Sequence, residues 1–144
     1  MNSLYIIPIK SITYSLNKEI ADFIAYHMIK PYFSSKYVKM YSQGIIYEEN
    51  KQIIGCALLR DIQCLITGNN EINIECLCVH KKYRNCGIGS KILQYIIQNT
   101  KPELPVLWVD KCFEYNNLKI FYKKNGFEVI LDEKKDFKMQ LSNL

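Results

Sequence analysis

The sequence predicts a mixed α/β domain with a largely antiparallel sheet. Its apolar runs follow the order β-α-(α)-β-β-β-α-β-α-β-β, and most neighbouring strand-like runs are joined by short polar turns that suit hairpins. One strand-like run, 72–79, instead leads through a glycine-containing turn into an amphipathic helix over 89–98. With 144 residues, 49% of them hydrophobic and 23% charged, the chain is expected to form one domain over 1–144, without a linker or an internal repeat.

The first quarter of the chain is predicted to hold an edge strand and a helix. The strand covers 4–9 and lies at an edge because Pro8 cannot donate a hydrogen bond to a neighbour. The helix is expected to begin at Lys18 with Asn17 as its N-cap, and to end or kink at Pro31. The segment 32–41 is expected to be a short helix or an irregular connection. The residues of one face of this amphipathic helix recur every three or four positions: Ile20, Phe23, Ile24, His27 and Met28.

The middle of the chain is predicted to form three consecutive strands. The first two, over 44–49 and 52–61, are joined by a turn at 49–51, and a second turn at 67–70 precedes the strand 72–79. The apolar run over 53–59 is nearly continuous, which is typical of a strand that is covered on both faces. The following helix presents a core-facing stripe of Ile88, Ile92, Leu93, Ile96 and Ile97.

The last third of the chain is predicted to form a strand, a helix and a closing hairpin. The strand covers 106–109 and follows a connection that contains Pro102 and Pro105. The helix covers 115–124 and stops at Asn125-Gly126, with Leu118, Phe121 and Tyr122 facing inward. The hairpin strands cover 127–131 and 136–141.

Composition excludes several classes of function. The formal charge of +5 comes from scattered lysines rather than a basic stripe with interleaved aromatics, so no nucleic-acid partner is expected. No apolar run approaches about 18 residues, and the N-terminus lacks a charged segment and a cleavage site, so neither a membrane partner nor a signal peptide is expected. The six cysteines lie outside any small loop-rich scaffold, so we expect reduced thiols and a cytoplasmic protein.

The turn between 79 and 91 has the properties of an anion site. Gly87 and Gly89 allow backbone N–H groups to approach a ligand, and the following helix directs its positive end toward the same place. Cationic side chains surround the turn: Lys81, Lys82, Arg84 and Lys91. The spacing does not fit the phosphate-binding loop G-x-x-x-x-G-K-[ST]. These residues alone predict a phosphate or pyrophosphate ligand without identifying the molecule that carries it.

Two motifs resemble those of the GNAT N-acetyltransferase superfamily. The run Arg84-x-x-Gly87-x-Gly89 is similar to that family's Q/R-x-x-G-x-G/A signature. Downstream, the segment 121–127 (FYKKNGF) resembles the family's second signature, an aromatic-Tyr-x-Lys-x-Gly-Phe run. The resemblance extends over essentially the whole chain in the same order. It implies a GNAT-like fold, with a central twisted, mostly antiparallel sheet of six to seven strands, about four flanking helices, and a splay between strands four and five.

The resemblance also implies an acetyl-CoA-dependent transfer to a primary amine by direct attack in a ternary complex, with no metal. Trp108 on the fifth strand is then expected near the arm of CoA. Where the family often has an Asn, this chain has Tyr115, and Leu118 replaces a small residue, so Asn116 or Asn117 is expected to substitute as a CoA contact. The CoA-binding residues implied by the resemblance are Leu77, Cys78, Val79, Arg84, Asn85, Cys86, Gly87, Ile88, Gly89, Ser90, Asn116 and Asn117.

The chemistry of amide formation requires a base for the ammonium proton and benefits from an acid near the thiolate. By resemblance, Glu75 is the candidate base, alone or through water, and Tyr122 is the candidate acid. Glu75 could instead bind a cationic substrate or form a salt bridge, and Tyr122 could be a half-buried core aromatic. The amine acceptor is open between a protein N-terminus, a lysine, a polyamine, an amino sugar and an aminoglycoside. A homodimer is a further possibility.

Other readings of the same residues remain as alternatives. The altered segment at Tyr115 and Leu118 suggests a catalytically weak or inactive module that binds or senses acyl-CoA. Cys76, Cys78 and His80 would share one strand face beside Glu75, which suggests zinc, although a second ligand pair with suitable spacing is missing. A nucleophilic Cys112 would need an orienting histidine. His27 lies on the inward helix face, which favours a structural role.

Overall fold

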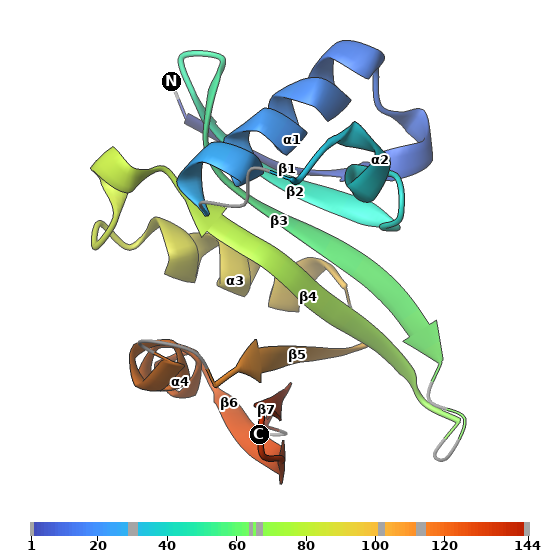
Figure 1. Cartoon of the computed structure of the whole chain (residues 1–144), viewed down its shortest axis with the longest axis vertical. Coiled ribbons are helices and arrows are strands. Elements are labelled where there is room, and N and C mark those ends of the chain that lie inside the picture. The colour runs from blue at the N-terminus through green and yellow to red at the C-terminus, as the bar shows by residue number, and fades with distance from the viewer. Residues whose placement is uncertain are drawn as a thin grey trace.

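The computed structural model describes residues 2–28, 32–63, 65, 68–100, 103–111 and 115–142. Within these ranges the chain forms seven strands in one sheet, four α-helices and two short 3₁₀ helices (Figure 1). In chain order the elements are β1 (Asn2–Pro8), η1 (Ile9–Ser11), α1 (Tyr14–His27), α2 (Ser35–Val38), β2 (Gln43–Glu49), β3 (Gln52–Gln63), β4 (Asn70–Val79), η2 (Lys81–Tyr83), α3 (Ile88–Asn99), β5 (Leu104–Asp110), α4 (Tyr115–Lys124), β6 (Phe127–Asp132) and β7 (Asp136–Leu141).

The sheet order is β1-β2-β3-β4-β5-β7-β6, and only β4 and β5 run parallel. This order confirms the predicted mixed α/β fold with a mostly antiparallel sheet. It also confirms that the first strand lies at an edge, where Pro8 pairs with Gln43 at the end of the ladder. None of the helices in the described ranges combines the length and the hydrophobicity that crossing a membrane requires.

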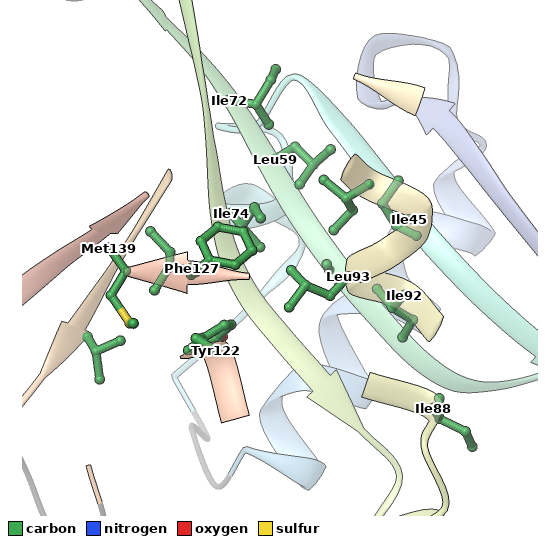
Figure 2. Close-up of a cluster of buried hydrophobic side chains, with 14 of the residues drawn as sticks. Ile45, Leu59, Ile72, Ile74, Ile88, Ile92, Leu93, Tyr122, Phe127 and Met139 are labelled. Atoms are coloured by element: carbon green, nitrogen blue, oxygen red, sulfur yellow. The ribbon is translucent and has the colours of Figure 1, made fainter. Parts of the chain in front are cut away.

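Two apolar clusters cover the two faces of the sheet. On one face α1 and α2 pack against β1–β4 through a cluster that contains Ile20, Ile24 and Leu58. On the other face α3 and α4 pack against strands from both halves of the sheet, through a cluster that contains Ile92, Leu93 and Phe127 (Figure 2). No residue after His80 belongs to the first cluster within the described part of the chain, so α1 and α2 leave this face of β5–β7 uncovered.

β3 is buried on both faces, as its continuous apolar run predicts. Residues 53–59 are all buried. Ile53, Cys56 and Leu58 contribute to the α1 side, whereas Ile54, Ala57 and Leu59 contribute to the α3 side. A central strand sandwiched in this way contributes roughly 1.5–3 kcal/mol for each fully buried large aliphatic side chain, which anchors the adjacent strand β4.

The predicted start of the first helix is wrong. α1 begins one turn earlier, at Tyr14, with Thr13 as the N-cap, because the Thr13 hydroxyl accepts a hydrogen bond from the backbone N–H of Leu16 at 3.1 Å. Asn17 lies inside the helix and is only 4% exposed. Both residues are good helix caps in sequence, and only the packing of α1 on the sheet selects between them.

The predicted inward position of Leu118 is also wrong, because this side chain is 44% exposed. The other two residues of that prediction are inside: Tyr122 is buried, and Phe121 is partly buried against the α3-side cluster. The short helix expected within 32–41 is present as α2. Pro31, Pro102, Cys112 and part of the predicted turn 67–70 lie outside the described residues.

Candidate active site

The glycine-containing turn connects the end of β4 to the start of α3. Asn85 and Gly87 both have a left-handed backbone, with φ of 64° and 82°. Gly87 is the N-cap of α3, without a side-chain hydrogen bond, and a Cβ at this position would meet no atom within 4 Å. The space in front of Gly87 is therefore open. A β-carbon at Gly89 would lie 3.2 Å from the Phe121 ring, so a side chain at this position would require the ring to shift slightly.

The amides of this turn have no acceptor within the described part of the chain. The first backbone hydrogen bond within α3 runs from Lys91 N–H to Gly87 O at 3.0 Å. The N–H groups of Ile88, Gly89 and Ser90 therefore remain free at the positive end of a twelve-residue helix. Together with the amides of 85–87, they form a group of backbone donors that suits an anion, and the binding of an anion by these residues stays a prediction. The side chain of Ile88 is buried, so only its backbone is available to a ligand.

Arg84 holds the turn onto the end of α1. Its Nε donates to the carbonyl of Val79 at 3.1 Å, and its Nη2 donates to the carbonyl of His27 at 2.5 Å. A guanidinium has five N–H donors, so further donors remain for an anion. The sequence motif does not reveal this bridging role, because His27 lies 57 positions away. Contact between Arg84 and a pyrophosphate stays a prediction.

His27 has a structural role in the same junction, as expected. Its Nδ1 accepts a hydrogen bond from the backbone N–H of Lys81 at 3.2 Å, and its ring lies 4.2 Å from that of His80. Burial, followed by the charges of His80, Arg84 and Lys81, lowers the pKa of His27. A neutral imidazole is the form that can accept this hydrogen bond, so the chemistry and the geometry agree.

Two further residues of the turn make local contacts. The thiol of Cys86 is exposed and lies 3.6 Å from the carbonyl of Arg84, within the turn itself. The hydroxyl of Ser90 accepts a hydrogen bond from Asn125 Nδ2 at 3.3 Å, and the same amide group donates to the carbonyl of Phe121 at 2.9 Å. Asn125 therefore ties the end of α4 to the first turn of α3, a role that the sequence did not indicate beyond its position at a helix end.

Strands β4 and β5 separate after three paired residues. Their pairing covers only Glu71–Asn73 against Leu104–Val106, and the two strands then run apart (Figure 1). The predicted splay between the fourth and fifth strands is therefore present. His80 N–H donates to Ile54 O on β3 at 2.8 Å. Because a strand alternates its backbone groups between neighbours, Cys78 also faces β3, whereas Leu77 and Val79 direct their backbone groups into the splay.

A β-bulge interrupts β4 beside the splay. Cys76 and Leu77 together oppose Ala57 of β3, and Cys76 has a φ of 55°. As a result Cys76 packs on the α1 side of the sheet, whereas Leu77 packs on the α3 side. The bulge also sets Glu75 next to the point where the backbone of Leu77 enters the splay.

Glu75 is held by three side chains on the side of the sheet that α1 and α2 partly cover. Its Oε1 lies 3.5 Å from the Tyr41 hydroxyl, and its Oε2 accepts from Asn73 Nδ2 at 3.1 Å. Arg60 Nε lies 3.6 Å from Oε2, and the Arg60 guanidinium lies over the Tyr41 ring. The carboxylate is about one-third exposed, so it is accessible as well as oriented.

Near Glu75 the sheet carries a buried amide and an exposed aromatic ring. Asn73 is 8% exposed, and its Oδ1 has no hydrogen-bond partner among the described residues. Trp108 of β5 is 43% exposed and alternates with the buried Leu107 and Val109. It therefore lies on the same face of the sheet as Glu75, across the splay. This arrangement agrees with the expectation that Trp108 lies beside the splay.

Tyr122 lies on the opposite face, within the α3-side cluster. Figure 2 shows it grouped with Phe127 and Ile74 beside β4. Burial raises the pKa of Tyr122 to about 12, so its hydroxyl is protonated at neutral pH. This hydroxyl has no hydrogen-bond partner among the described residues. Leu77 and Val79 pack against the same cluster, so Tyr122 belongs to the core that lies beneath the strand residues next to the splay.

The remaining predicted contacts lie at the start of α4. Asn116 and Asn117 are both exposed, and Tyr115 packs its ring 6.1 Å from that of Phe137. Tyr115 is therefore committed to the edge of the core, whereas both asparagines are available to a ligand. In the part of the chain that the structure describes, no three His, Cys, Asp or Glu side chains are arranged to hold a metal ion.

Comparisons with known proteins give a consistent family. Residues 41–129 match the model of the "Acetyltransferase (GNAT) domain". No protein of the curated collection matches the chain in sequence. An acyl-CoA N-acyltransferase from Pseudomonas aeruginosa has a similar fold, with a TM-score of 0.77 at 10% identity, over 99% of this chain and 100% of that one.

Two further solved structures are similar in fold. PH1933 from Pyrococcus horikoshii has a TM-score of 0.73 at 20% identity and covers 99% of this chain and 100% of its own. Arabidopsis thaliana Naa50, solved with a bisubstrate analogue of CoA and the peptide MVNAL, has a TM-score of 0.71 at 18% identity and covers 98% and 99%. The family match spans more than half of the sequence and includes the turn, the splay and α4, so the chain belongs to the GNAT acetyltransferase family.

Proposed function

We propose that this protein is an acetyl-CoA-dependent N-acetyltransferase that moves an acetyl group to a primary amine by direct attack in a ternary complex. The observation that carries the proposal is the continuous line of free backbone groups at the splay. It runs from the backbone of Leu77 and the N–H of Val79 to the amides at the start of α3, which have no acceptor among the described residues, whereas the Val79 carbonyl accepts from Arg84 Nε. An extended pantetheine arm can pair with the strand backbone, and a pyrophosphate suits the helix N-terminus.

The CoA-binding residues follow from this line. The amides of 85–90 bind the pyrophosphate, and Arg84 stabilises the conformation of the turn. The exposed Asn116 and Asn117 lie at the start of α4, where one of them contacts the arm of CoA. Acetyl-CoA supplies the activated acetyl group as a thioester, and no metal takes part.

The reaction needs a proton to leave the amine and a proton to reach the departing sulfur. Glu75 accepts the ammonium proton, directly or through a water molecule, because it is the accessible carboxylate next to the bulge. The backbone N–H of Leu77 is available to an acyl oxygen that gains negative charge. Tyr122 donates its proton to the thiolate, since its pKa of about 12 keeps it protonated at neutral pH.

The acceptor is a small molecule or a protein amine that reaches Glu75 across the uncovered face of the sheet. Naa50 was solved with a peptide-bearing bisubstrate analogue, which makes a peptide N-terminus one class to test.

The first test is calorimetric titration with acetyl-CoA, followed by a screen of amine acceptors with detection of released thiol. We expect acetyl-CoA to bind, and at least one class among peptides, polyamines, amino sugars and aminoglycosides to be acetylated. Absence of acetyl-CoA binding would refute the proposal. Binding without transfer across the panel would favour the sensing module that the departure at Tyr115 and Leu118 suggests.

The role of Tyr122 has a separate test. Replacing the hydroxyl in Tyr122→Phe should lower turnover more than about tenfold, within the usual contribution of general acid catalysis of about 10²–10⁴. The affinity for acetyl-CoA should stay unchanged, because the ring still fills the same position in the core. Steady-state kinetics and calorimetry measure the two effects, and near-wild-type turnover would exclude Tyr122 as the acid.

A further inference from the structure

Two side chains of opposite charge lie together on the sheet face next to the splay. In the pairing of β3 with β4, Arg60 is opposite Asn73, and Leu58 is opposite Glu75. Residues that are paired in this way, or that lie two positions apart on one strand, point to the same face. Arg60 Nε lies 3.6 Å from Glu75 Oε2, which is longer than a hydrogen bond of about 2.7–3.2 Å. Arg60 and Glu75 are therefore an ion pair in which the guanidinium keeps donors for another group.

Arg60 is fixed in its position by the segment that follows α2. Its guanidinium carbon lies 4.9 Å from the centre of the Tyr41 ring. The next residue, Ser42, bonds to β3 on both sides of Arg60. Its N–H donates to the Leu59 carbonyl at 2.8 Å, and its hydroxyl accepts from the Asp61 N–H at 3.0 Å. A planar cation that already lies over an aromatic ring loses little freedom when it binds a further partner, so Arg60 is preorganised for a ligand.

The outer end of the Arg60 side chain is available to an anion. The side chain is 38% exposed although its Nε is buried, so the exposure belongs to its other atoms. Its contacts among the described residues are those with Glu75 and Tyr41, which leave the four N–H donors of Nη1 and Nη2 without an acceptor. A second cation of this face, Lys138, is already paired, because its Nζ lies 3.2 Å from Glu71 and both side chains are mostly buried. In the described part of the chain, Arg60 is therefore the cation beside Glu75 that can bind an anionic group.

The charges on this face change sign from one side of the splay to the other. Asp110 on β5 and Asp136 on β7 are paired, and they lie two positions from Trp108 and Lys138, so they share the face of Glu75. Neither aspartate forms a salt bridge within the described residues. The face therefore carries an available cation on β3, the candidate base on β4 and two carboxylates on β5 and β7. This polarity suits a dipolar molecule whose anionic end lies toward β3 and whose ammonium group lies at the splay.

We propose that the acceptor is a primary amine that also carries a carboxylate or phosphate group, which Arg60 binds while the ammonium group meets Glu75. This inference rests on the proposed acetyltransferase function and names the substrate class of the same site. Oε1 of Glu75 is the oxygen that is open to the ammonium group. Oε2 accepts from Asn73 at 3.1 Å and faces Arg60, whereas Oε1 has the Tyr41 hydroxyl at 3.5 Å as its one partner among the described residues.

The anionic group is unchanged by the reaction and serves to position the amine. The ammonium group gives a proton to Glu75, and the amine nitrogen forms a bond to the acetyl carbon. The bond between that carbon and the sulfur of CoA breaks, and the departing sulfur takes the proton of Tyr122, as in the proposed function. Two fixed contacts, at Arg60 and at Glu75, orient the amine better than one. Polyamines and aminoglycosides carry positive charges alone and lack the group that Arg60 binds.

The test compares kcat/KM, measured by release of the CoA thiol, between acceptors that differ in the anionic group alone. Alanine, methionine and phenylalanine are compared with their amides, and glucosamine 6-phosphate is compared with glucosamine. Spermidine and a short peptide represent acceptors without an anionic group near the amine. The amino acid amides have the less basic amines, which favours them in the reaction, so a preference for the carboxylates reports recognition. We expect the anionic member of at least one pair to be preferred at least about tenfold, as charge-assisted hydrogen bonds to Arg60 imply. The pair in which this preference appears distinguishes a carboxylate from a phosphate.

Variants of Arg60 separate recognition of the acceptor from a structural role. Arg60→Gln should reduce the preference for the anionic member at least about tenfold, and Arg60→Lys should restore part of it, because lysine keeps the charge without the planar fork. A loss of stability or a misplaced Glu75 lowers kcat/KM for both members of a pair, so the ratio between them reports recognition alone. Lys39→Gln is the charge-matched control, since Lys39 is an exposed cation two residues before Tyr41, and it should leave the ratio unchanged.

The outcomes separate this inference from the function on which it rests. Absence of transfer to every amine of the panel would refute the proposed function, and this inference with it. Transfer that is equal or faster with the uncharged members, with spermidine or with the peptide would overturn this inference and leave the acetyltransferase function in place. The same holds if Arg60→Gln keeps the preference of the wild-type protein, or if Lys39→Gln reduces it as much as Arg60→Gln does.

Discussion

The two sides of the β4–β5 splay are built from different parts of the polypeptide. The turn at the start of α3 presents backbone amides without an acceptor among the described residues, and its Arg84 side chain contacts backbone carbonyls. The region around Glu75 consists of side chains from three separate segments, contributed by Tyr41, Arg60 and Asn73. The first region depends on the shape of a short contiguous segment, and the second depends on tertiary packing.

This difference predicts which substitutions the turn and the Glu75 region each tolerate. A backbone-built site loses its ligand when the conformation of the turn changes, and it is insensitive to most side-chain replacements in the turn. A site built from side chains loses chemistry when one functional group is removed, while its shape survives. The following predictions test this contrast, from the largest expected effect to the smallest.

Removing the carboxylate in Glu75→Gln should produce the largest effect. The amide keeps the shape of the side chain but cannot accept the ammonium proton, so kcat/KM should fall about 10²–10⁴-fold. The affinity for acetyl-CoA, measured by calorimetry, should stay within about twofold if Glu75 serves the acceptor alone, because the variant then keeps all of its contacts with CoA. If Glu75 is only a partner of Arg60, the variant will lose thermal stability while keeping its turnover.

Altering the backbone in Gly87→Val should weaken acetyl-CoA binding at least about tenfold, because two or more charge-assisted hydrogen bonds of about 1.5–3 kcal/mol are misplaced. The φ of 82° is unfavourable for a β-branched residue, and the new side chain would enter the open space before α3. Gly68→Val is the matched control, with a φ of 74° and equally open surroundings in another turn. Equal CoA affinity in the two variants would contradict a ligand at the turn.

Removing the side chain in Arg84→Ala should have an intermediate effect. The turn would lose its two hydrogen bonds to α1 and β4, so acetyl-CoA affinity should fall about three- to tenfold, at roughly 1 kcal/mol for ordering the turn. Lys82→Ala removes a neighbouring exposed cation and should change the affinity less. A larger effect for Lys82 would mean that net charge, rather than the conformation of the turn, determines binding.

The smallest predicted effect is on the pH dependence of the free energy of unfolding. Because the pKa of His27 is lowered in the folded state, the unfolded chain binds more protons below its ordinary pKa of about 6.5. The contribution of His27 to the free energy of unfolding is therefore complete above that pH. It declines as the pH falls from the pKa of the unfolded state to the lower pKa of the folded state. Urea titrations between about pH 7.5 and 5 should show this decline, and His27→Gln should flatten it. If the variant showed the same decline of stability with falling pH, His27 would not be the cause of that decline.

The sequence by itself determined the elements that depend on local pattern. The strand, turn and helix over 72–98, the doubly covered β3 and the helix at 115–124 follow from hydrophobic periodicity and glycine positions, which act within a few residues. The group of backbone donors at the start of α3 was predictable for the same reason, since unpaired amides at a helix start are a local property. The family resemblance added the identity of the ligand as an expectation.

Only the tertiary structure decided the features that join distant segments. The choice of Thr13 over Asn17 as the N-cap, and the exposure of Leu118, depend on how each helix packs on the sheet. The bridge from Arg84 to His27 and the group around Glu75 join residues that are 57 and 34 positions apart. A periodic pattern shows which face of an element is apolar, but it does not show which partner meets that face, because contact between distant segments is set by the packing of the whole core.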